Sequence, residues 1–355
     1  VQRPCDVVED ILRIYGYNNV EIPSELKSSL TIAGDADKDY KRENIVSEQL
    51  VGEGFNEILN NSLTKTSYYE KNELNKYTWD KTVKVMNPLS ADLGVMRQTL
   101  LFGGLESIVR NINRKAKNLK FFEVGNCYWF NAEKHTPESP IKAYAQDYHM
   151  ALWVTGKRVE GSWAHADEDS SFYELKAYVD NIFRRVGITR EMLVEEPSDN
   201  NIFDKALTIE NHGGKTIAEL GIVNHKILKD FDIDQHVFYA DIDWQALMKM
   251  SHKIKLEFKE LSKYPAVSRD LALLIDDNVK FADIEKIARQ TEKKLLKRVE
   301  LFDVYTGKNL PAGKKSYAVN FILQDENKTL NDKAIDAIMK KLIHQLTTKL
   351  GAELR

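Results

Sequence analysis

Cysteine is scarce in this chain of 355 residues, which contains only Cys5 and Cys127. Two isolated cysteines make neither a disulfide framework nor a Cys-x-x-Cys metal pair, so a reducing, cytoplasmic compartment is expected. The 17 glycines and 8 prolines are too few for a collagen-like or low-complexity chain. The mean hydropathy is −0.45, and no apolar run approaches the roughly 18 residues of a membrane-spanning helix, so no membrane partner is expected.

Neither sign of charge dominates the whole chain, but the two ends differ. The 51 basic and 54 acidic residues give a formal net charge of −3. Residues 262–355 contain 18 basic and 13 acidic residues, a net charge of +5, which leaves −8 for the rest. An acidic body with a basic C-terminal region indicates an anionic partner such as nucleic acid at that end. A chance excess of surface lysines would give the same numbers.

The length predicts two or three domains, and the apolar pattern predicts mixed secondary structure. The chain begins with Val1, close to an amphipathic helix expected at 3–15, and we expect it to be a piece of a longer protein. A polar linker is expected at 17–35. Further helices are expected at 40–60, 98–113, 171–187 and 244–250, and strands at 83–86, 120–130, 148–154, 217–223 and 237–241. Because the two types do not alternate strictly, we predict an α+β fold with a largely antiparallel sheet.

The last 94 residues, 262–355, give the clearest pattern. They predict strand, helix, two strands, helix and a final edge strand, at Leu271–Asp276, Asp283–Leu296, Val299–Thr306, Lys315–Leu323, Asn331–Leu350 and Ala352–Arg355. The order β-α-β-β-α-β is that of the ferredoxin-like fold. Both helices of such a fold cover one face of the sheet, so the opposite face is left open.

Strand alternation sorts the residues of the two middle strands between these faces. We expect Phe302, Val304 and the row Tyr317, Val319, Phe321 and Leu323 to face the helices. The open face would then carry Leu301, Asp303, Tyr305, Ser316, Ala318 and Asn320. One aromatic ring among hydrogen-bonding groups suits the stacking and edge readout of single-stranded RNA bases. Alternatively, Tyr305 caps the sheet edge or packs against another domain.

Long blocks of the sequence resemble one family. Residues 262–276 (SKYPAVSRDLALLID) and 299–324 (VELFDVYTGKNLPAGKKSYAVNFILQ) are similar to the ferredoxin-fold anticodon-binding domain of the bacterial phenylalanyl-tRNA synthetase β subunit. Residues 85–125 and 221–233 resemble the synthetase-like module of that subunit, and 6–23 the end of the small domain before it. The resemblance runs in order along nearly the whole chain.

The resemblance implies three parts. These are the end of a small domain (1–25), a degenerate class II synthetase-like module (26–257) and an anticodon-binding domain (258–355). It also implies a heterotetramer of two α and two β chains that joins phenylalanine to its tRNA with ATP and Mg²⁺, with the active site on α. Arg97 stands where a phosphate-binding arginine would be, but no glycine-rich segment ending in Glu-Arg follows. We therefore expect a catalytically inactive scaffold with Arg97 in a salt bridge.

The resemblance also implies a set of anticodon contacts. Asp303 and Tyr305 match the family's LFDxYxG motif, and Ser316 matches the serine of its Lys-Ser step. Tyr305 would stack on a base, and Asp303 and Ser316 would bond to base edges. The remaining candidates are Asn320 on the same face and the phosphate contacts Arg269, Lys314 and Lys315.

Three carboxylates suggest a metal site in the first helix. Asp6, Glu9 and Asp10 lie at i, i+3 and i+4 and so share one helix face, and oxygen ligands suit Mg²⁺. The resemblance implies such a site, but its first ligand would precede Val1, and Asp10 stands where glutamate is usual. The site is thus expected to be incomplete. The alternative is a solvated helix face paired with Arg3 and Arg13.

Other classes of function fit less well. A free-standing RNA-binding or scaffold protein would keep the open-face residues and need no α partner. An acylphosphatase shares the fold but needs an arginine after the first strand, and residues 276–281 contain none. The eight histidines show no zinc-binding spacing, and no phosphate-binding G-x-x-x-x-G-K-[ST] loop occurs.

Overall fold

The chain folds into two compact units in a computed structural model. The structure describes all residues except 1–2, 26–33, 71–73, 255–257, 259 and 308–309. The first unit spans Val1–Leu256 and the second Glu257–Arg355. Each unit is built on its own largely or wholly antiparallel sheet, so the predicted α+β class is confirmed.

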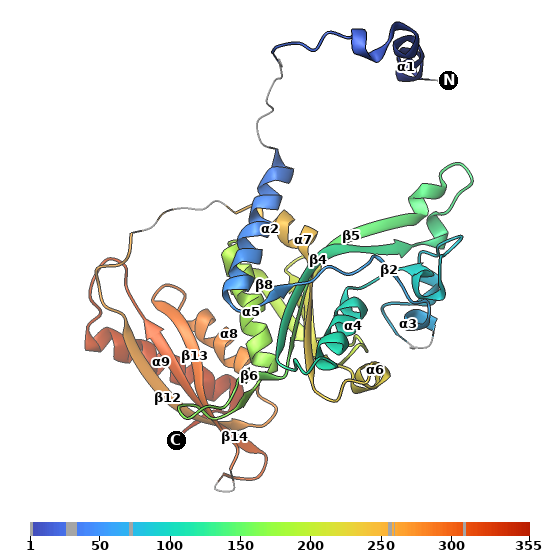
Figure 1. Cartoon of the computed structure of the whole chain (residues 1–355). Coiled ribbons are helices and arrows are strands. Elements are labelled where there is room, and N and C mark those ends of the chain that lie inside the picture. Colours follow the sequence, from blue (N-terminus) through green and yellow to red (C-terminus); the bar gives the residue numbers. More distant parts are fainter. Residues whose placement is uncertain (1–2, 26–33, 71–73, 255–257, 259, 308–309) are drawn as a thin grey trace. The chain divides into compact units, whose positions relative to one another are not determined.

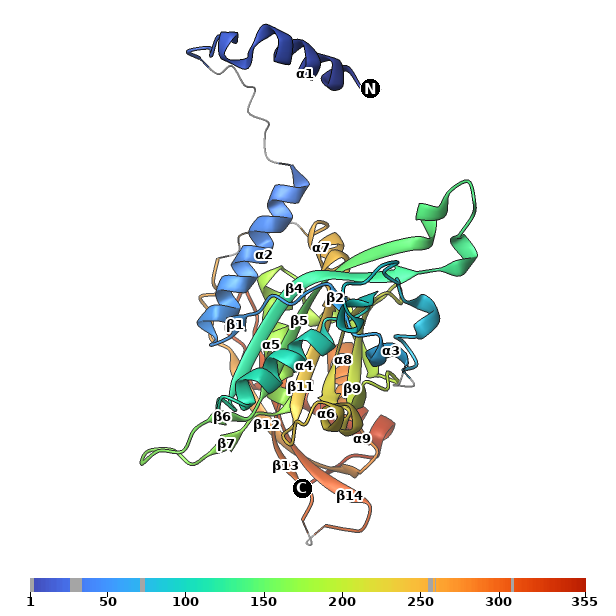
Figure 2. The same ribbon diagram turned by 45° about the vertical axis from the view of Figure 1, so that its right-hand side comes forward.

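A sheet of seven strands organises the first unit. Its order is β1 (Asn56–Glu57), β4 (Leu119–Phe130), β5 (Tyr144–Thr155), β11 (Val237–Asp243), β10 (Thr216–Val223), β9 (Phe203–Asn211) and β8 (Leu193–Pro197). Neighbouring strands are antiparallel except β1 and β4, which are parallel. Figures 1 and 2 show helices on both faces of this sheet. Both faces are therefore apolar over much of their area.

The two faces have separate cores. One core includes residues of α2 (Asp35–Gly52), α5 (Phe172–Arg185) and α7 (Trp244–Ser251). The other includes residues of α3 (Ser67–Glu70), α4 (Leu101–Ile112) and α6 (His225–Asp230). Successive residues of β5 serve opposite cores, Leu152 the first and Trp153 the second. A Cβ on Gly104 of α4 would lie 2.1 Å from the Trp153 indole, so α4 approaches the sheet closely only because that residue is glycine.

Some expected elements differ in the structure. The strand expected at 83–86 is only an isolated bridge between Lys84 and Val95. Strands β8 and β9 went unpredicted because charged residues interrupt their apolar pattern, as in the LVEEP sequence of the edge strand β8. Two short sheets complete the unit: β2 (Leu63–Thr64) with β3 (Val95–Met96), and β6 (Lys157–Val159) with β7 (Glu168–Asp169).

The first helix, α1 (Pro4–Tyr15), forms as predicted and ends at Gly16, whose φ is 93°. None of its residues is buried. The linker expected at 17–35 contains a short 3₁₀ turn at Tyr17–Asn19, and its residues 26–33 lie outside those the structure describes. Within the described ranges, no helix combines the length and apolar character needed to cross a membrane.

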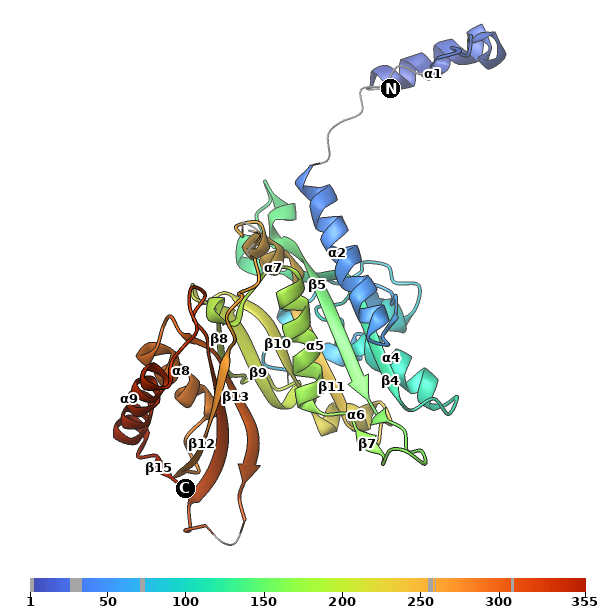
Figure 3. The same ribbon diagram turned by 90° about the vertical axis from the view of Figure 1, so that its left-hand side faces the viewer.

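The second unit has the predicted ferredoxin-like order. It runs β12 (Val267–Asp276), α8 (Phe281–Thr291), β13 (Leu296–Tyr305), β14 (Lys314–Leu323), α9 (Asp332–Leu350) and β15 (Glu353–Leu354). The sheet order is β13-β14-β12-β15, and all neighbours are antiparallel. Figure 3 shows α8 and α9 on one face of this sheet. The Asn331 side chain caps α9 by accepting a bond from Ala334 N at 2.9 Å, and Gly351 ends it at a φ of 62°.

The helix expected to extend to Leu296 ends earlier, at Thr291, because Leu296 already opens β13. This strand also carries two register shifts. Leu301 pairs with Val319 and Asp303 with Ala318, so Phe302 is an extra residue in a β-bulge. The expectation that Leu301 lies on the open face and Phe302 on the helix side was therefore wrong. Leu301 packs against the core, whereas Phe302 is 59 % exposed.

Candidate nucleic-acid interface

The face of the second unit's sheet opposite α8 and α9, here called the open face, carries most of the predicted RNA contacts. Tyr305 pairs with Ser316 across β13 and β14, and Asp303 pairs with Ala318. Asn320 and Lys314 lie at alternate positions of β14 on the same side as Ser316. Since residues in directly paired positions share a face, the register brings these side chains together.

Tyr305 is the aromatic centre of the open face. Its ring is partly exposed and lies against Gly307, where a Cβ would stand 2.1 Å from the Tyr305 hydroxyl oxygen. The Arg355 guanidinium lies 5.5 Å from the ring centroid, a cation–π distance. Gly307 thus has a physical role in the sequence motif, because any larger residue would displace the tyrosine.

Arg355 was not among the predicted contacts. Its backbone N–H donates to Ala272 O at 3.0 Å, which continues the pairing of β15 along β12. Glu353 pairs with Leu274 on the open face, and Arg355 lies two residues further along the same strand direction. Extending strand alternation through the predicted edge strand would have placed both charged residues on this face.

The remaining polar side chains of the open face differ in exposure and in the bonds that they already form. Asp303 is exposed, whereas Ser316 is 7 % exposed and so lies in the floor of the face. The Asn320 amide donates to both Ser268 and Asp270 on the neighbouring strand. Lys314 Nζ lies 2.5 Å from Glu353 Oε1, and this bond raises the pKa of the half-buried lysine.

Two predicted phosphate contacts lie on the other side of the sheet. Arg269 pairs with Phe321, a core residue, and its guanidinium lies 3.9 Å from Asp332 at the start of α9. Lys315 pairs with Ile275, donates to Asp277 O at 2.7 Å, and lies 4.8 Å from the ring centroid of Tyr317. The structure therefore separates these two cations from Asp303 and Tyr305.

In the first unit, Arg97 is buried in the predicted salt bridge. Its Nη1 lies 2.6 Å from Glu123 Oε1, and its Nε donates to Asn126 O at 2.9 Å. Gly125 leaves room for the guanidinium, because a Cβ there would lie 2.2 Å from Arg97 Nη2. Glu123 is fully buried and also accepts the backbone N–H of Asn60 at 3.1 Å. The Arg97 guanidinium therefore bonds to groups inside the protein.

A second buried polar group lies on the same face of the seven-stranded sheet. His149 Nδ1 is 2.7 Å from Asp241 Oδ1, and the Tyr77 hydroxyl donates to Asp241 Oδ2 at 3.4 Å. Burial alone would lower the pKa of His149, but the Asp241 carboxylate outweighs it and raises that pKa. Burial likewise opposes ionisation of Asp241, yet His149 holds its pKa below the usual value. The neighbouring Glu219 pairs with Lys76.

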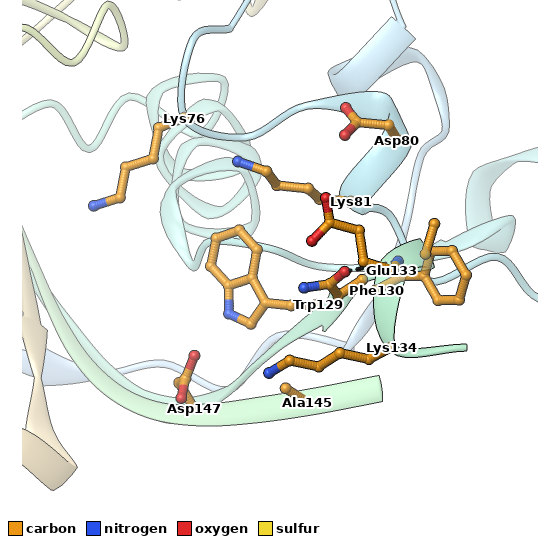
Figure 4. Close-up of a pocket in the computed structure, with 11 residues that line it drawn as sticks. Lys76, Asp80, Lys81, Trp129, Phe130, Glu133, Lys134, Ala145 and Asp147 are labelled. Carbon is orange, nitrogen blue, oxygen red and sulfur yellow. Dashed lines mark hydrogen bonds between the residues drawn. The ribbon is translucent and has the colours of Figure 1, made fainter. Parts of the chain in front are cut away.

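A cavity of the first unit lies at the ends of β4 and β5 (Figure 4). It measures about 770 Å³. Trp129 lines it and stacks on Tyr77, with ring centroids 5.9 Å apart. Its charged lining is balanced, with three lysines and three carboxylates: Lys76, Lys81, Lys134, Asp80, Glu133 and Asp147. A lining without net charge gives no preference for an anionic nucleotide.

The three carboxylates of α1 do not converge on a metal position. Asp6 lies 3.1 Å from Arg3, and Asp10 lies 3.5 Å from Arg13. Over the described part of the chain, no group of three or more His, Cys, Asp or Glu side chains is arranged to hold a metal ion. This helix face carries arginine–carboxylate pairs, and none of its residues is buried.

Comparison with known proteins defines the class. The profile of the phenylalanyl tRNA synthetase beta chain CLM domain matches residues 22–244, and that of the ferredoxin-fold anticodon binding domain matches residues 262–355. A pyrrolysyl-tRNA synthetase structure from Desulfitobacterium hafniense covers 60 % of this chain and 69 % of its own at 14 % identity, with a TM-score of 0.45. That likeness is too weak to carry an argument.

The sequence relatives are closer. The phenylalanine–tRNA ligase beta subunit of Bacteroides fragilis is 63 % identical over 355 residues, which is all of this chain and 43 % of the relative. The corresponding subunit of Clostridium tetani is 33 % identical over 99 % of this chain and 42 % of its own. This chain belongs to the phenylalanyl-tRNA synthetase β chain family. It spans less than half the length of the curated relatives it matches.

Proposed function

We propose that this chain supplies anticodon recognition and subunit scaffolding to a phenylalanine–tRNA ligase. The observation that carries the proposal is the placement of Tyr305 on the open face, next to hydrogen-bonding groups. The ring lies against Gly307 and is partly exposed, so an unpaired base can reach it for stacking. Such stacking is worth about 1–3 kcal/mol per base.

The neighbouring side chains would add base selection. The Asp303 carboxylate accepts hydrogen bonds, so it suits a base edge that presents amino or imino N–H groups. The Ser316 hydroxyl can donate or accept at the floor of the same face. Asn320 keeps its carbonyl oxygen as an acceptor, while Lys314 offers charge to a phosphate, without sequence preference. Arg355 would hold the Tyr305 ring in position.

The scaffolding role concerns residues 26–257, with 1–25 as the end of a preceding domain and 258–355 as the anticodon reader. Arg97 is turned inward onto Glu123, which supports the proposal that catalysis takes place on an α subunit. The β subunit name of the relatives suggests such a partner. In the assembly, proposed as two α and two β chains in the cytoplasm, α would use ATP and Mg²⁺ to form the aminoacyl bond.

The test is a binding measurement on the full chain. A phenylalanine tRNA transcript and a copy with a substituted anticodon are titrated at low and moderate salt. We expect tighter binding of the native anticodon at both salt concentrations, because base contacts are less screened than phosphate contacts. Equal binding of both transcripts, with the same steep salt dependence, would overturn anticodon reading by this chain.

The partner is tested separately by co-expression with a family α subunit. The proposal predicts a stable complex in which phenylalanine is attached to tRNA. A chain that discriminates anticodons but never associates with α would instead be a free-standing RNA-binding protein.

A further inference from the structure

The positive charge of the second unit does not lie on its open face. By strand register, the described residues give this face three basic side chains and five acidic ones: Arg298, Lys314, Arg355, Asp270, Asp276, Glu300, Asp303 and Glu353. Residues 262–355 as a whole contain 18 basic and 13 acidic residues. The excess of basic residues therefore belongs to the helices, the loops and the helix-covered side of the sheet.

A groove between α8 and α9 collects part of that charge. It has a volume of about 320 Å³ and is lined by Gln290, Thr291, Lys341, His344, Gln345 and Lys349. Figure 3 shows the two helices next to each other on the covered side of the sheet. Lys341, Gln345 and Lys349 follow at intervals of four residues, so they line one side of α9. The lining of this groove, which we call the α8–α9 groove, contains no carboxylate among the described residues.

Two carboxylates close to the groove in the sequence are bonded to groups that do not line it. Glu285 is 7 % exposed and accepts a bond from Arg289 Nε at 3.0 Å. Glu292 Oε1 accepts the backbone N–H groups of Lys294 and Leu295, each at 3.0 Å. In contrast, no ion pair joins Lys341 or Lys349 to a carboxylate within the ranges that the structure covers. Both lysine side chains are exposed to solvent.

This donor set fits phosphate. Two ammonium groups supply charge, and the amides of Gln290 and Gln345 supply N–H donors. The Thr291 hydroxyl instead donates to Ile287 O at 2.7 Å, so it offers only an acceptor. An open groove between two helices suits a chain of phosphates better than an enclosed small molecule. The exposed lysines would contribute by counterion release, which needs no base contact.

We propose that the α8–α9 groove is a second RNA-binding site, which takes the phosphate backbone of a segment other than the anticodon. The sheet separates this groove from the open face, so one anticodon loop cannot occupy both. The assignment of the anion as RNA rests on the function proposed above. The groove supplies salt-dependent affinity, and the open face supplies selection.

The experiment measures the anisotropy of a labelled oligouridylate of about 12 nucleotides bound to the full chain, between roughly 50 and 200 mM salt. The variant is K341Q/K349Q. Its matched control is K328Q/K333Q, which removes two exposed lysines of the same unit outside the groove. We expect the affinity of the groove variant to fall about tenfold at low salt. The negative slope of log K against log salt should become shallower by about 1.4. The control should change less than about twofold.

Three outcomes would overturn the proposal. The groove variant could match the control with an unchanged unfolding curve, Tyr305→Ala could abolish the salt slope, or an oligoglutamate competitor could displace the RNA with equal affinity. Failure of anticodon discrimination is read from the tRNA titration instead. Failure of the groove proposal can therefore be told apart from failure of the proposed function.

Discussion

The two units both place polar side chains on a face of an antiparallel sheet, but they use them in opposite ways. In the first unit, Arg97, Glu123 and Asp241 are buried and bond to groups of the same unit. In the second unit, Asp303 and Tyr305 remain accessible on the open face. Charges buried in pairs are satisfied internally, and a ligand would have to break those pairs. Accessible groups are free to bind.

This difference shows how a binding site can be recognised. The bonds that its polar side chains already form within the protein are more informative than the residue types alone. The first unit contains arginine, lysines, histidine and carboxylates on one sheet face, a composition found in many active sites. Their mutual bonds make that face a structural element. Substitutions in the first unit should therefore affect stability, and those in the second should affect binding.

The largest expected effect is that of Arg97→Ala. It would leave Glu123 buried without its positive partner, so we expect the free energy of unfolding to fall by about 3–5 kcal/mol. Urea denaturation followed by circular dichroism measures this. The exposed Arg114→Ala is the matched control and should change stability by no more than about 0.5 kcal/mol. If Arg97→Ala lowers the free energy of unfolding by less than about 1 kcal/mol, the Arg97–Glu123 pair does not have the structural role expected here.

The next largest effect is expected for Tyr305→Ala, in the second unit. We expect the affinity for phenylalanine tRNA to fall by about 1–3 kcal/mol, with little change in stability because the ring is exposed. Tyr305→Phe keeps the ring and should retain most of the affinity. If the alanine variant folds correctly and binds as tightly as the parent chain, stacking on this residue is refuted.

Gly307→Ala should produce a smaller loss. The new methyl group would collide with the Tyr305 ring, which must then move away. We expect anticodon discrimination to weaken by about 1 kcal/mol, part of the value of one stacked base, while the unfolding curve stays nearly unchanged. Gly52→Ala meets no atom within 4 Å and serves as the control. Equal discrimination by the two variants would contradict the supporting role of Gly307.

The smallest effect concerns pH. The pKa of His149 is raised in the folded chain, so its stabilisation is present below its unfolded value of about 6.5 and is lost as pH rises through the folded value. The pKa of Asp241 is lowered, so its contribution is present above about 3.9 and is lost as pH falls through its own folded value. Unfolding free energy should therefore decline as pH rises from about 6.5 through the raised pKa of His149.

This decline should shrink in His149→Gln and persist in the control His165→Gln, whose side chain is exposed. Unfolding curves recorded across the pH range compare the two variants. Identical pH profiles would show that the His149–Asp241 pair does not contribute.

Much of this arrangement could be predicted from the sequence. Strand alternation placed Asp303, Tyr305, Ser316 and Asn320 on one face because most of β14 is regular, and helical spacing located α9. The bulge at Phe302 could not be predicted, because nothing in the local pattern marks the extra residue. Alternation along β12 and β14 also places Arg269 and Lys315 on the helix-covered side, because they lie two residues from Leu271 and Tyr317. The mutual pairing of the buried charges depends on contacts between residues far apart in the sequence, such as His149 and Asp241.

The extra residue in β13 has one more consequence. Phe302 is not paired with β14, so the alternation of side chains between the two faces shifts by one residue at this position. Substitutions that repack the hydrophobic interior around Val299 and Leu301 need not shift Asp303 or Tyr305. The bulge also increases the local twist. Core substitutions near Val299 and Leu301 should therefore change the thermal stability of the unit without moving the two side chains proposed to bind RNA.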